Sequence, residues 1–427
     1  MQVMKWSALA LAVTAGTTQL AFASAQSESK GFVEDSSFDI FNRVLYMNRD
    51  FKNGAANGNS TSANPAGYRE ETGLGIRLLF ESGFTQGTVG VGVDAHSLSS
   101  IKLDSGRGKF GNGLFDQTSD GRGDDTQTEV GGAVKFRISD TVLKYGNQFV
   151  GSPVFSTDDS RILPEVATGT YLVSNEIEGL ELSAGRFTAL SSQASTDRDT
   201  FGIETADIVG ASYAFTENFS GSVHASDVED YWKKYYGNLN YTLPLAEEQA
   251  LNFDFNIYKT DYEDEYSNGE FDDNTIWSLA TAYSIGAHKF TLAYQRSSGD
   301  HGYDYGVDGN GTVWLNNSVQ YSDFYGEDER SWQVRYDLDM ASYGVPGLSF
   351  MTRYVTGDNA KVDGFEEEGK EHEWNFETKY VIQEGAAKDL SFRVRHAIWR
   401  ANDAYNAYNG ADNNDFRVIV DYPLDVL

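Results

Sequence analysis

The chain has 427 residues, no cysteine, and 33 basic against 64 acidic residues, which gives a formal net charge of −31 at pH 7. The lack of cysteine excludes disulfides and thiol sites, and the negative charge argues against nucleic acid as a partner. Beyond residue 25 there is no run of about 18 apolar residues, so the sequence offers no membrane-spanning helix.

The first 25 residues have the pattern of a secretory signal peptide. Lys5 supplies the positive start, Ala8 to Ala15 form a short apolar run, and Ala23-Ser24-Ala25 is a small-residue cleavage site. The apolar run is too short for a membrane anchor and is followed by small and polar residues. The sequence therefore predicts export and a mature chain over residues 26–427.

From residue 37 onward, short segments in which apolar and polar residues alternate recur at the spacing of β-strands. We count eighteen such segments, at 37–48, 68–81, 85–98, 127–139, 141–149, 166–176, 178–190, 204–216, 217–228, 230–243, 249–262, 272–285, 287–298, 328–341, 346–358, 369–384, 386–401 and 412–425. An even number of alternating segments without a domain break predicts an 18-stranded antiparallel transmembrane β-barrel.

The breaks between these segments fall into two classes, which a soluble β-sandwich or β-solenoid would not require. Short breaks rich in Gly, Asn or Asp suit tight hairpins and lie at 81–83, 139–140, 177–179, 216–218, 246–248, 285–287, 344–347 and 384–386. Longer, acidic breaks lie at 54–67, 99–126, 150–165, 191–203, 261–273, 298–327, 358–369 and 401–413. The longer set is expected to face outward and the shorter set to face the periplasm.

Alternation also gives each segment two faces. In the segment 386–401, Phe392 and Val394 share one face, and Arg393 and Arg395 share the other. The basic residues that lie opposite apolar ones in this way are Lys135, Arg137, Arg335, Arg353, Lys379, Arg393, Arg395 and Arg417. An arginine that faces lipid at mid-depth costs roughly 2–4 kcal/mol, so these side chains are expected to face an aqueous lumen.

A solute carboxylate can move along a row of guanidinium groups from one group to the next, and its negative charge stays paired at each step. Selective conduction needs this combination of binding strong enough for entry and weak enough for release. The alternative is that lumen arginines only pair with lumen acids, such as Asp337, Asp339 and Glu377.

Several longer strings resemble one family. The strings at residues 31–37, 80–90, 159–164 (Asp-Ser-Arg-Ile-Leu-Pro), 184–188 (Ala-Gly-Arg-Phe-Thr) and 417–424 are similar to those of the OprD (Occ) family of substrate-selective outer membrane porins. The resemblance spans essentially the whole mature chain. It implies a monomeric or loosely trimeric barrel with an inward-folded constriction loop, a lumen lined by arginines and lysines, and small carboxylate-bearing cargo.

The break 150–165 is the candidate constriction loop, with Ser156, Asp158, Asp159 and Ser160 as its candidate pore residues. The resemblance adds four arginines to the basic row: Arg43, Arg161, Arg186 and Arg296. The break near 227–230 is the one short member of the outward set, which makes 298–327 the seventh of that set. The resemblance also places acids of this seventh break across from the basic row, where Asp300, Asp304 and Asp308 are available.

Alternation disagrees with the resemblance at two of these arginines. Arg186 shares its face with Leu182, and Arg296 shares its face with Phe290 and Leu292. A bulge or an early strand exit would be needed to turn either guanidinium inward.

These patterns predict an outer membrane porin that passes small carboxylate-bearing solutes, such as aromatic acids, amino acids or dicarboxylates, by diffusion. The expected partners are outer membrane lipid, lipopolysaccharide and small anionic or zwitterionic solutes, with no cofactor, metal or nucleic acid. A sugar channel of the same family, for example for chito-oligosaccharides, stays open. A barrel hydrolase or an adhesin is the alternative class, although no Gly-x-Ser-x-Gly or His-Glu-x-x-His motif is present.

Overall fold

The structure is a computed structural model that describes residues 24–427 except 61–64, 107, 119–121, 308–310 and 312. The expected signal peptide, residues 1–25, therefore lies outside the described part apart from its last two residues. Within the described ranges, no helix is both long and apolar enough to span a membrane.

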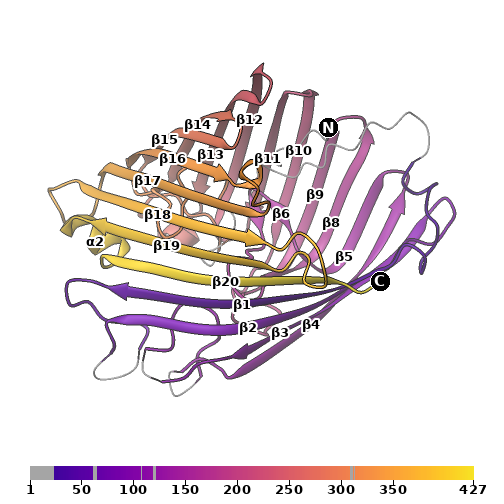
Figure 1. The fold of residues 1–427 in the computed structure, drawn as a ribbon, viewed down its shortest axis with the longest axis horizontal. Helices are drawn as coiled ribbons and strands as arrows, with labels where there is room; N and C mark the ends of the chain where they lie inside the picture. Colours follow the sequence, from indigo (N-terminus) through magenta and orange to yellow (C-terminus); the bar gives the residue numbers. More distant parts are fainter. Residues whose placement is uncertain (1–23, 61–64, 107, 119–121, 308–310, 312) are drawn as a thin grey trace.

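Eighteen strands of the described chain form one closed antiparallel sheet, in which each strand pairs with the next and β20 pairs with β1 (Figure 1). The strands of the ring are β1 (Ser37–Phe51), β2 (Tyr68–Glu81), β3 (Gly90–Lys102), β4 (Thr126–Ile138), β5 (Thr141–Gln148), β8 (Val166–Ile177), β9 (Leu180–Ser191), β10 (Ala206–Thr216), β11 (Phe219–Val228), β12 (Trp232–Ala246), β13 (Gln249–Tyr262), β14 (Asp273–Ile285), β15 (His288–Gly299), β16 (Arg330–Asp339), β17 (Leu348–Ala360), β18 (Gly369–Val381), β19 (Ser391–Ala401) and β20 (Asn413–Asp425). The predicted 18-stranded antiparallel barrel is confirmed.

The strand alternation divides the wall into an apolar outward face and a polar inward face. On the outward face Leu292 and Trp332 keep 51% and 53% of their surface exposed. On the inward face their sequence neighbours Ala293 and Gln333 are buried under chain that enters the barrel. In the alternating segments, the apolar positions therefore face the lipid and the polar positions face the lumen.

Two predicted strand starts differ from the structure by five residues, whereas the other starts agree within two residues. The strand expected at 85–98 begins at Gly90, because the chain near residue 26 holds the preceding turn: Gln26 Nε2 donates to the Thr85 carbonyl at 2.9 Å. The strand expected at 386–401 begins at Ser391, because the turn before it is closed by a bond from Ile382 N to Leu390 O at 2.9 Å. Both periplasmic turns are therefore longer than the sequence predicts.

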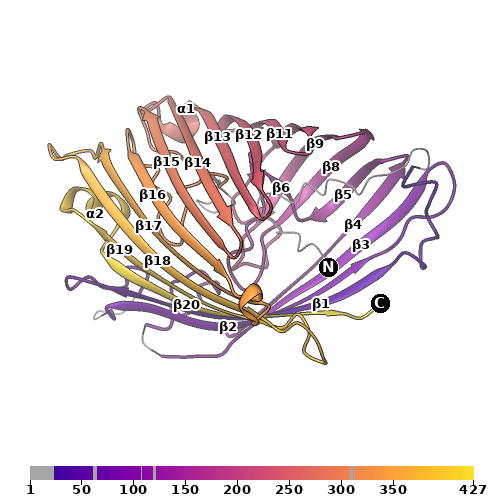
Figure 2. The same ribbon diagram turned by 45° about the horizontal axis from the view of Figure 1, so that its top comes forward.

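The short helices all lie in connections between strands. They are α1 (Asp264–Ser267), η1 (Ala341–Tyr343) and α2 (Asp403–Asn409). The helices α1 and α2 belong to the long connections, whereas η1 lies in a periplasmic turn between β16 and β17 (Figure 2).

Three long connections reach into the barrel: the described residues of 103–125, through the buried Leu114 and Phe115, and residues 149–165 and 300–329. We call residues 149–165 loop 3 and residues 300–329 loop 7. Loop 3 contains a small hairpin of β6 (Gly151–Ser152) and β7 (Phe155–Ser156), and both views place β6 within the ring of strands (Figures 1 and 2). An apolar cluster of both loops and the inward wall therefore forms the core of the molecule inside the barrel.

Candidate functional site: the barrel lumen

Loop 3 is anchored on the inward face of the wall at two places. Near its start, the Phe155 ring stacks on Phe187 of β9 with ring centroids 4.9 Å apart. Near its end, Ile162 and Leu163 pack with Leu45 and Met47 of β1 in a second buried apolar cluster. Because β1 and β9 are not neighbours in the ring, loop 3 crosses the interior, as predicted for the break 150–165.

Glycines of β2 make this crossing sterically possible. A Cβ atom on Gly75 would lie 2.3 Å from the Ile162 carbonyl oxygen, and one on Gly73 would lie 2.8 Å from the Ile162 Cδ1 atom. Real Cβ atoms do not approach so closely, so only glycine lets the backbone of loop 3 lie against the wall.

Two wall arginines hold the tip of loop 3 by its carboxylate and its carbonyls. Arg43 Nη1 donates to Asp159 Oδ1 at 3.0 Å and to the Arg161 carbonyl at 2.9 Å. Arg77 of β2 donates to the Ile162 carbonyl at 3.0 Å and pairs with the same Asp159 carboxylate. The side chains of Arg43 and Arg77 are only 14% and 7% exposed, which fits a positioning role for both.

The remaining candidates of loop 3 are partly used inside the loop. Asp158 accepts hydrogen bonds from the backbone N and the hydroxyl of Ser160, at 2.9 and 2.6 Å. Arg161 Nε donates to the Asn112 carbonyl at 2.9 Å, and Ser156 ends the short strand β7. Among the described residues, no carboxylate lies within 4.0 Å of the Arg161 guanidinium.

The inward faces of β16 to β20 carry a group of cations that continues onto β1. We call the following set the cationic arc: Arg335, Arg353, Lys379, Arg393, Arg395, Arg417 and Arg43. Three pairs within it are direct cross-strand partners: Arg335 with Arg353, Lys379 with Arg393, and Arg395 with Arg417. The sequence prediction had included all seven.

Carboxylates of the same wall neutralise part of the arc. Glu377 lies 3.1 Å from Arg395 Nε and 3.7 Å from Arg393 Nε. Arg335 makes two hydrogen bonds to Asp337, at 2.8 and 2.7 Å, and Arg417 pairs with Asp415 at 2.6 Å. The alternative that lumen arginines pair with lumen acids therefore holds for these members.

Arg353 and Lys379 differ from the rest of the arc. Arg353 Nε donates to the amide oxygen of Asn375 at 2.6 Å, and in the described chain neither cation has a carboxylate within 4.0 Å. Asp323 of loop 7 is within electrostatic reach of Arg353. Glu373 and Glu377 also act on Arg353 from a distance, but none of these carboxylates makes an ion pair with it. A cation without a direct ion pair keeps its capacity to bind an incoming anion.

Loop 7 follows the inward wall beside the arc rather than standing above it. Gln320 Nε2 donates to Asp415 Oδ1 at 2.9 Å, and Arg417 donates to the Gln320 carbonyl at 3.1 Å. Farther along, Ser322 N donates to Glu373 at 2.8 Å. Hydrogen bonds of this kind, donated or accepted by single polar residues, leave no periodic signal in the sequence.

The loop 7 acids that were predicted to face the basic row lie at the extracellular rim instead. Asp300 accepts bonds from the backbone N–H groups of Asp272 and Asp273 at the rim, at 3.0 and 2.9 Å. Asp304 accepts from the Tyr266 hydroxyl at 3.1 Å, next to α1. The expectation that Asp300 and Asp304 face the arc is corrected, because rim partners hold both; Asp308 lies outside the described residues.

Two other basic candidates face inward but away from the arc. Lys135 of β4 pairs with Asp94 at 2.6 Å. Arg137 donates to Gln26 Oε1 at 2.9 Å and lies 4.1 Å from the centroid of the Phe84 ring, at the periplasmic end. Their partners belong to β3 and to the first part of the chain, so they do not extend the row on β16–β20.

Arg186 and Arg296 lie on the outward face, which corrects their inclusion in the basic row. Arg186 makes two hydrogen bonds with Asp207 of β10, both at 2.6 Å, and remains 65% exposed. Arg296 continues the outward series of Phe290 and Leu292. No bulge interrupts β15 before it, so the alternation, and not the resemblance, predicted its side correctly.

Sequence reasoning also missed inward residues. Arg77 shares its face with Gly73 and Gly75, opposite Leu74 and Ile76, so the alternation already contained this signal. Arg49 pairs with Asp415 at 3.0 Å, with its guanidinium carbon 4.6 Å from the Tyr321 ring centroid. Arg49 lies one residue beyond the predicted segment 37–48, so the alternation was not extended to it, although β1 continues to Phe51.

A buried carboxyl anchors the end of loop 7. Glu329 accepts hydrogen bonds from Gly326 N at 2.9 Å and from the Tyr405 hydroxyl of α2 at 3.0 Å. Burial raises the pKa of Glu329 to about 7, and the neighbouring Glu371 is part of the same buried group.

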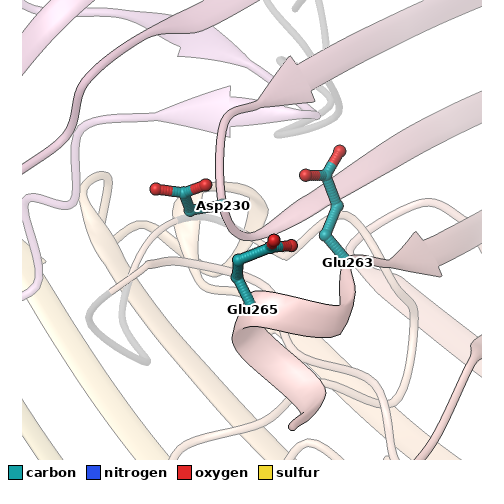
Figure 3. A group of neighbouring side chains, drawn as sticks. All are labelled: Asp230, Glu263 and Glu265. Carbon is teal, nitrogen blue, oxygen red and sulfur yellow. The ribbon is translucent and has the colours of Figure 1, made fainter. Parts of the chain in front are cut away.

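A separate group of carboxylates lies on the rim. Asp230, Glu263 and Glu265 place carboxylate oxygens within 4.8 Å of one another, from the turn after β11 and from the start of α1 (Figure 3). Lys233 pairs with Glu263 at 2.9 Å and neutralises part of the charge. The group is outside the lumen and touches none of the residues of the cationic arc.

A closed ring of strands with an apolar outward face, a charged inward face and loops folded into its bore is the architecture of a transmembrane diffusion channel. The comparisons with known proteins agree. Residues 30–426 match the family described as outer membrane porin, OprD family. The chain belongs to the OprD family of outer membrane porins, and its place is the outer membrane.

Individual relatives support this assignment over the full length. The chain is 48% identical to Porin D of Pseudomonas aeruginosa over 459 residues, with 100% of each chain covered. It is 34% identical to OccAB1 of Acinetobacter baumannii, whose crystal structure superposes with a TM-score of 0.89 over 95% of this chain and all of that one. The structure of Pseudomonas aeruginosa OpdK with vanillate matches at 33% identity and a TM-score of 0.80, over 93% and 100% of the two chains. These relatives are channels rather than enzymes.

Proposed function

We propose that the channel passes small carboxylate-bearing solutes along the cationic arc. The observation that carries this proposal is the pair Arg353 and Lys379, which have no carboxylate within 4.0 Å among the described residues. A solute carboxylate can bind there without first displacing a carboxylate of the wall.

The spacing of the arc suits transfer from one cation to the next. Direct cross-strand partners hold their Cβ atoms about 4.5–5.5 Å apart, which is within the reach of one carboxylate between two guanidinium groups. Arg335 with Arg353 and Lys379 with Arg393 are such partners. The wall acids Glu377 and Asp337 compete for the same cations, so each binding step stays shallow enough for release.

Loop 3 is proposed to set the size limit beside this path. Arg43 and Arg77 fix its tip at Asp159. Arg161 of the loop interacts electrostatically with Arg417 of the cationic arc and with Arg49 of β1. A relative supports the chemistry of the cargo: the OpdK structure was obtained with vanillate, an aromatic carboxylate.

The test is a reversal-potential measurement on the purified protein in a planar bilayer under a KCl gradient, with benzoate added as a blocker. Anion selectivity is expected for the native channel, and a shift toward cations for Arg353→Gln combined with Arg393→Gln. The half-blocking concentration of benzoate should rise about tenfold or more, as expected for the loss of charge-assisted hydrogen bonds.

Lys144→Gln is the matched control, since Lys144 is an inward cation of β5 that pairs with Asp94, away from the arc. The proposal would be refuted by a cation-selective channel whose selectivity does not change when Arg353→Gln and Arg393→Gln are combined. Block by an uncharged chito-oligosaccharide, but not by benzoate, would favour the sugar channel. No conductance at all would favour a hydrolase or an adhesin, and an assay of ester hydrolysis would then distinguish these two classes.

A further inference from the structure

Two arginines face each other on the outward side of the barrel near its extracellular end. Arg296 of β15 and Arg330 of β16 are direct partners in the antiparallel register. Both are exposed, and each continues an outward apolar series, Leu292 on β15 and Trp332 on β16. Neither guanidinium can therefore act in the lumen.

Aromatic side chains surround this pair on the same face. Tyr294 and Trp332 lie one step deeper, with ring centroids 4.6 Å apart, and Trp277 of β14 is the register partner of Arg296 and lies 5.4 Å from Tyr294. Residues two positions apart in a strand are about 6.6 Å apart along it, so the arginines lie immediately on the extracellular side of Tyr294 and Trp332 and level with Trp277. Aromatic girdles mark the membrane–water interface, which places the two guanidinium groups at the level of lipid headgroups.

The charges of this pair are not balanced within the described chain. Like charges placed directly opposite each other in a sheet are destabilising. Arg330 donates to Asp358 of β17 at 3.1 and 2.9 Å. Arg296 has no carboxylate within 4.0 Å among the residues described, so one positive charge of the pair remains for an anion from outside.

The neighbouring wall offers room for a bulky headgroup. A groove of about 530 Å³ opens at the extracellular ends of β17 and β18, lined by Thr356, Asp358, Lys370 and His372 among others. Asp358 belongs both to this groove and to the ion pair with Arg330. The register of β17 and β18 shifts between Gly357 and Ala360, so the ladder is irregular beside the groove.

The geometry points to a site for a phosphate group of a lipid A headgroup in the outer leaflet, bound between Arg296 and Arg330. Guanidinium groups bind phosphate oxygens in pairs of parallel hydrogen bonds. The site faces lipid rather than the lumen, so its ligand is a membrane lipid and not a transported solute. The inference is independent of the solute that the channel passes.

Native mass spectrometry of the detergent-solubilised protein tests the site, with lipid A that carries both phosphates and with dephosphorylated lipid A as probes. The native protein is expected to bind the phosphorylated lipid more tightly, by about tenfold or more. The double variant Arg296→Gln with Arg330→Gln should lose this preference. Arg296→Gln alone, which leaves the Arg330–Asp358 pair intact, serves if the double variant does not fold.

Arg186→Gln is the matched control, because Arg186 is also outward-facing but already has Asp207 as a partner. It should retain the preference for the phosphorylated lipid, and all variants should keep the single-channel conductance. The inference is overturned if the arginine variants bind phosphorylated lipid A as well as the native protein does. Equal loss in Arg186→Gln, or equal binding of both lipids by the native protein, would overturn it too.

Discussion

At Gly75 the inward wall has no side chain, and a carbonyl group of loop 3 occupies the space. The Ile162 oxygen that would lie 2.3 Å from a Cβ atom there also accepts a hydrogen bond from Arg77 two residues farther along β2. One strand therefore supplies both the room for the loop and a donor for its backbone.

Replacing Gly75 with alanine is expected to move loop 3 off the wall. The clash is with backbone, which cannot rotate away as a side chain can, so docking should weaken by about 1–3 kcal/mol, the usual range for overpacking. Single-channel recordings should show altered conductance and more open-channel noise. Gly237→Ala is the control, since its Cβ would meet only Ile257 Cγ2 at 3.4 Å; equal recordings for Gly75→Ala and the native channel would contradict the expectation.

The residue scale also shows what the sequence alone could predict about the site. Alternation placed Arg353, Arg393 and Arg417 inward, because the choice between water and lipid decides the face of every strand residue. It gave no information on which cations lack a carboxylate, because pairing depends on side chains from strands and loops far apart in the chain. Arg353 beside Asn375 and Arg395 beside Glu377 look equivalent until the register is known.

At the scale of elements, the strands were predictable and the path of the loops was not. Period two recurs in all eighteen segments and is independent of distant contacts. Loop 7, by contrast, is held by scattered polar contacts such as Gln320 with Asp415 and Ser322 with Glu373. The start of β3 at Gly90 was missed for a similar reason, since Gln26 holds the turn from 59 residues away.

The anchor of loop 7 at Glu329 should depend on pH. Burial raises the pKa of Glu329 to about 7, so protonated Glu329 stabilises the folded loop fully at low pH, and this contribution is lost as the pH rises through the raised pKa. The Gly326 amide, which donates to Glu329, should exchange its hydrogen up to about tenfold faster at about pH 8 than at about pH 6 after correction for the intrinsic rate.

Glu329→Gln should weaken this pH dependence, because the neutral amide does not titrate and only Glu371 of the buried group is left to do so. Glu368→Gln is the control, since Glu368 is a rim acid paired with Lys370 at 2.9 Å. If exchange at Gly326 had the same pH dependence in Glu329→Gln as in the native protein, another group would have to hold the loop.

At the scale of the whole molecule, opposite charges occupy different places. The chain carries a net charge of −31, yet the inward faces of β16–β20 and β1 present the cationic arc. The acid surplus lies mainly in the connections between strands, as with Asp230, Glu263 and Glu265 on the rim. Ion selectivity should therefore report the lumen rather than the average composition.

This separation predicts a channel whose anion selectivity falls with salt concentration. The Debye length shortens from about 10 Å at 0.1 M to about 3 Å at 1 M, so fixed charges of the wall are screened from the path in concentrated KCl. Reversal potentials at a constant concentration ratio should approach the value of free diffusion as both solutions are concentrated. Selectivity that does not change with salt would instead indicate a purely steric filter at loop 3.

The pairing of β1 with β20 has a consequence for assembly. Asp39 lies opposite Asp425 and Phe51 opposite Asn413, so the seam joins the first and the last strand of the chain. Contacts between residues so distant in sequence form late and slowly, because the whole intervening chain must first be ordered. Until that moment the nascent sheet has two unpaired edges, which are templates for aggregation. The cell must therefore shield both edges until the last strand arrives, and loss of β20 alone would leave them open permanently.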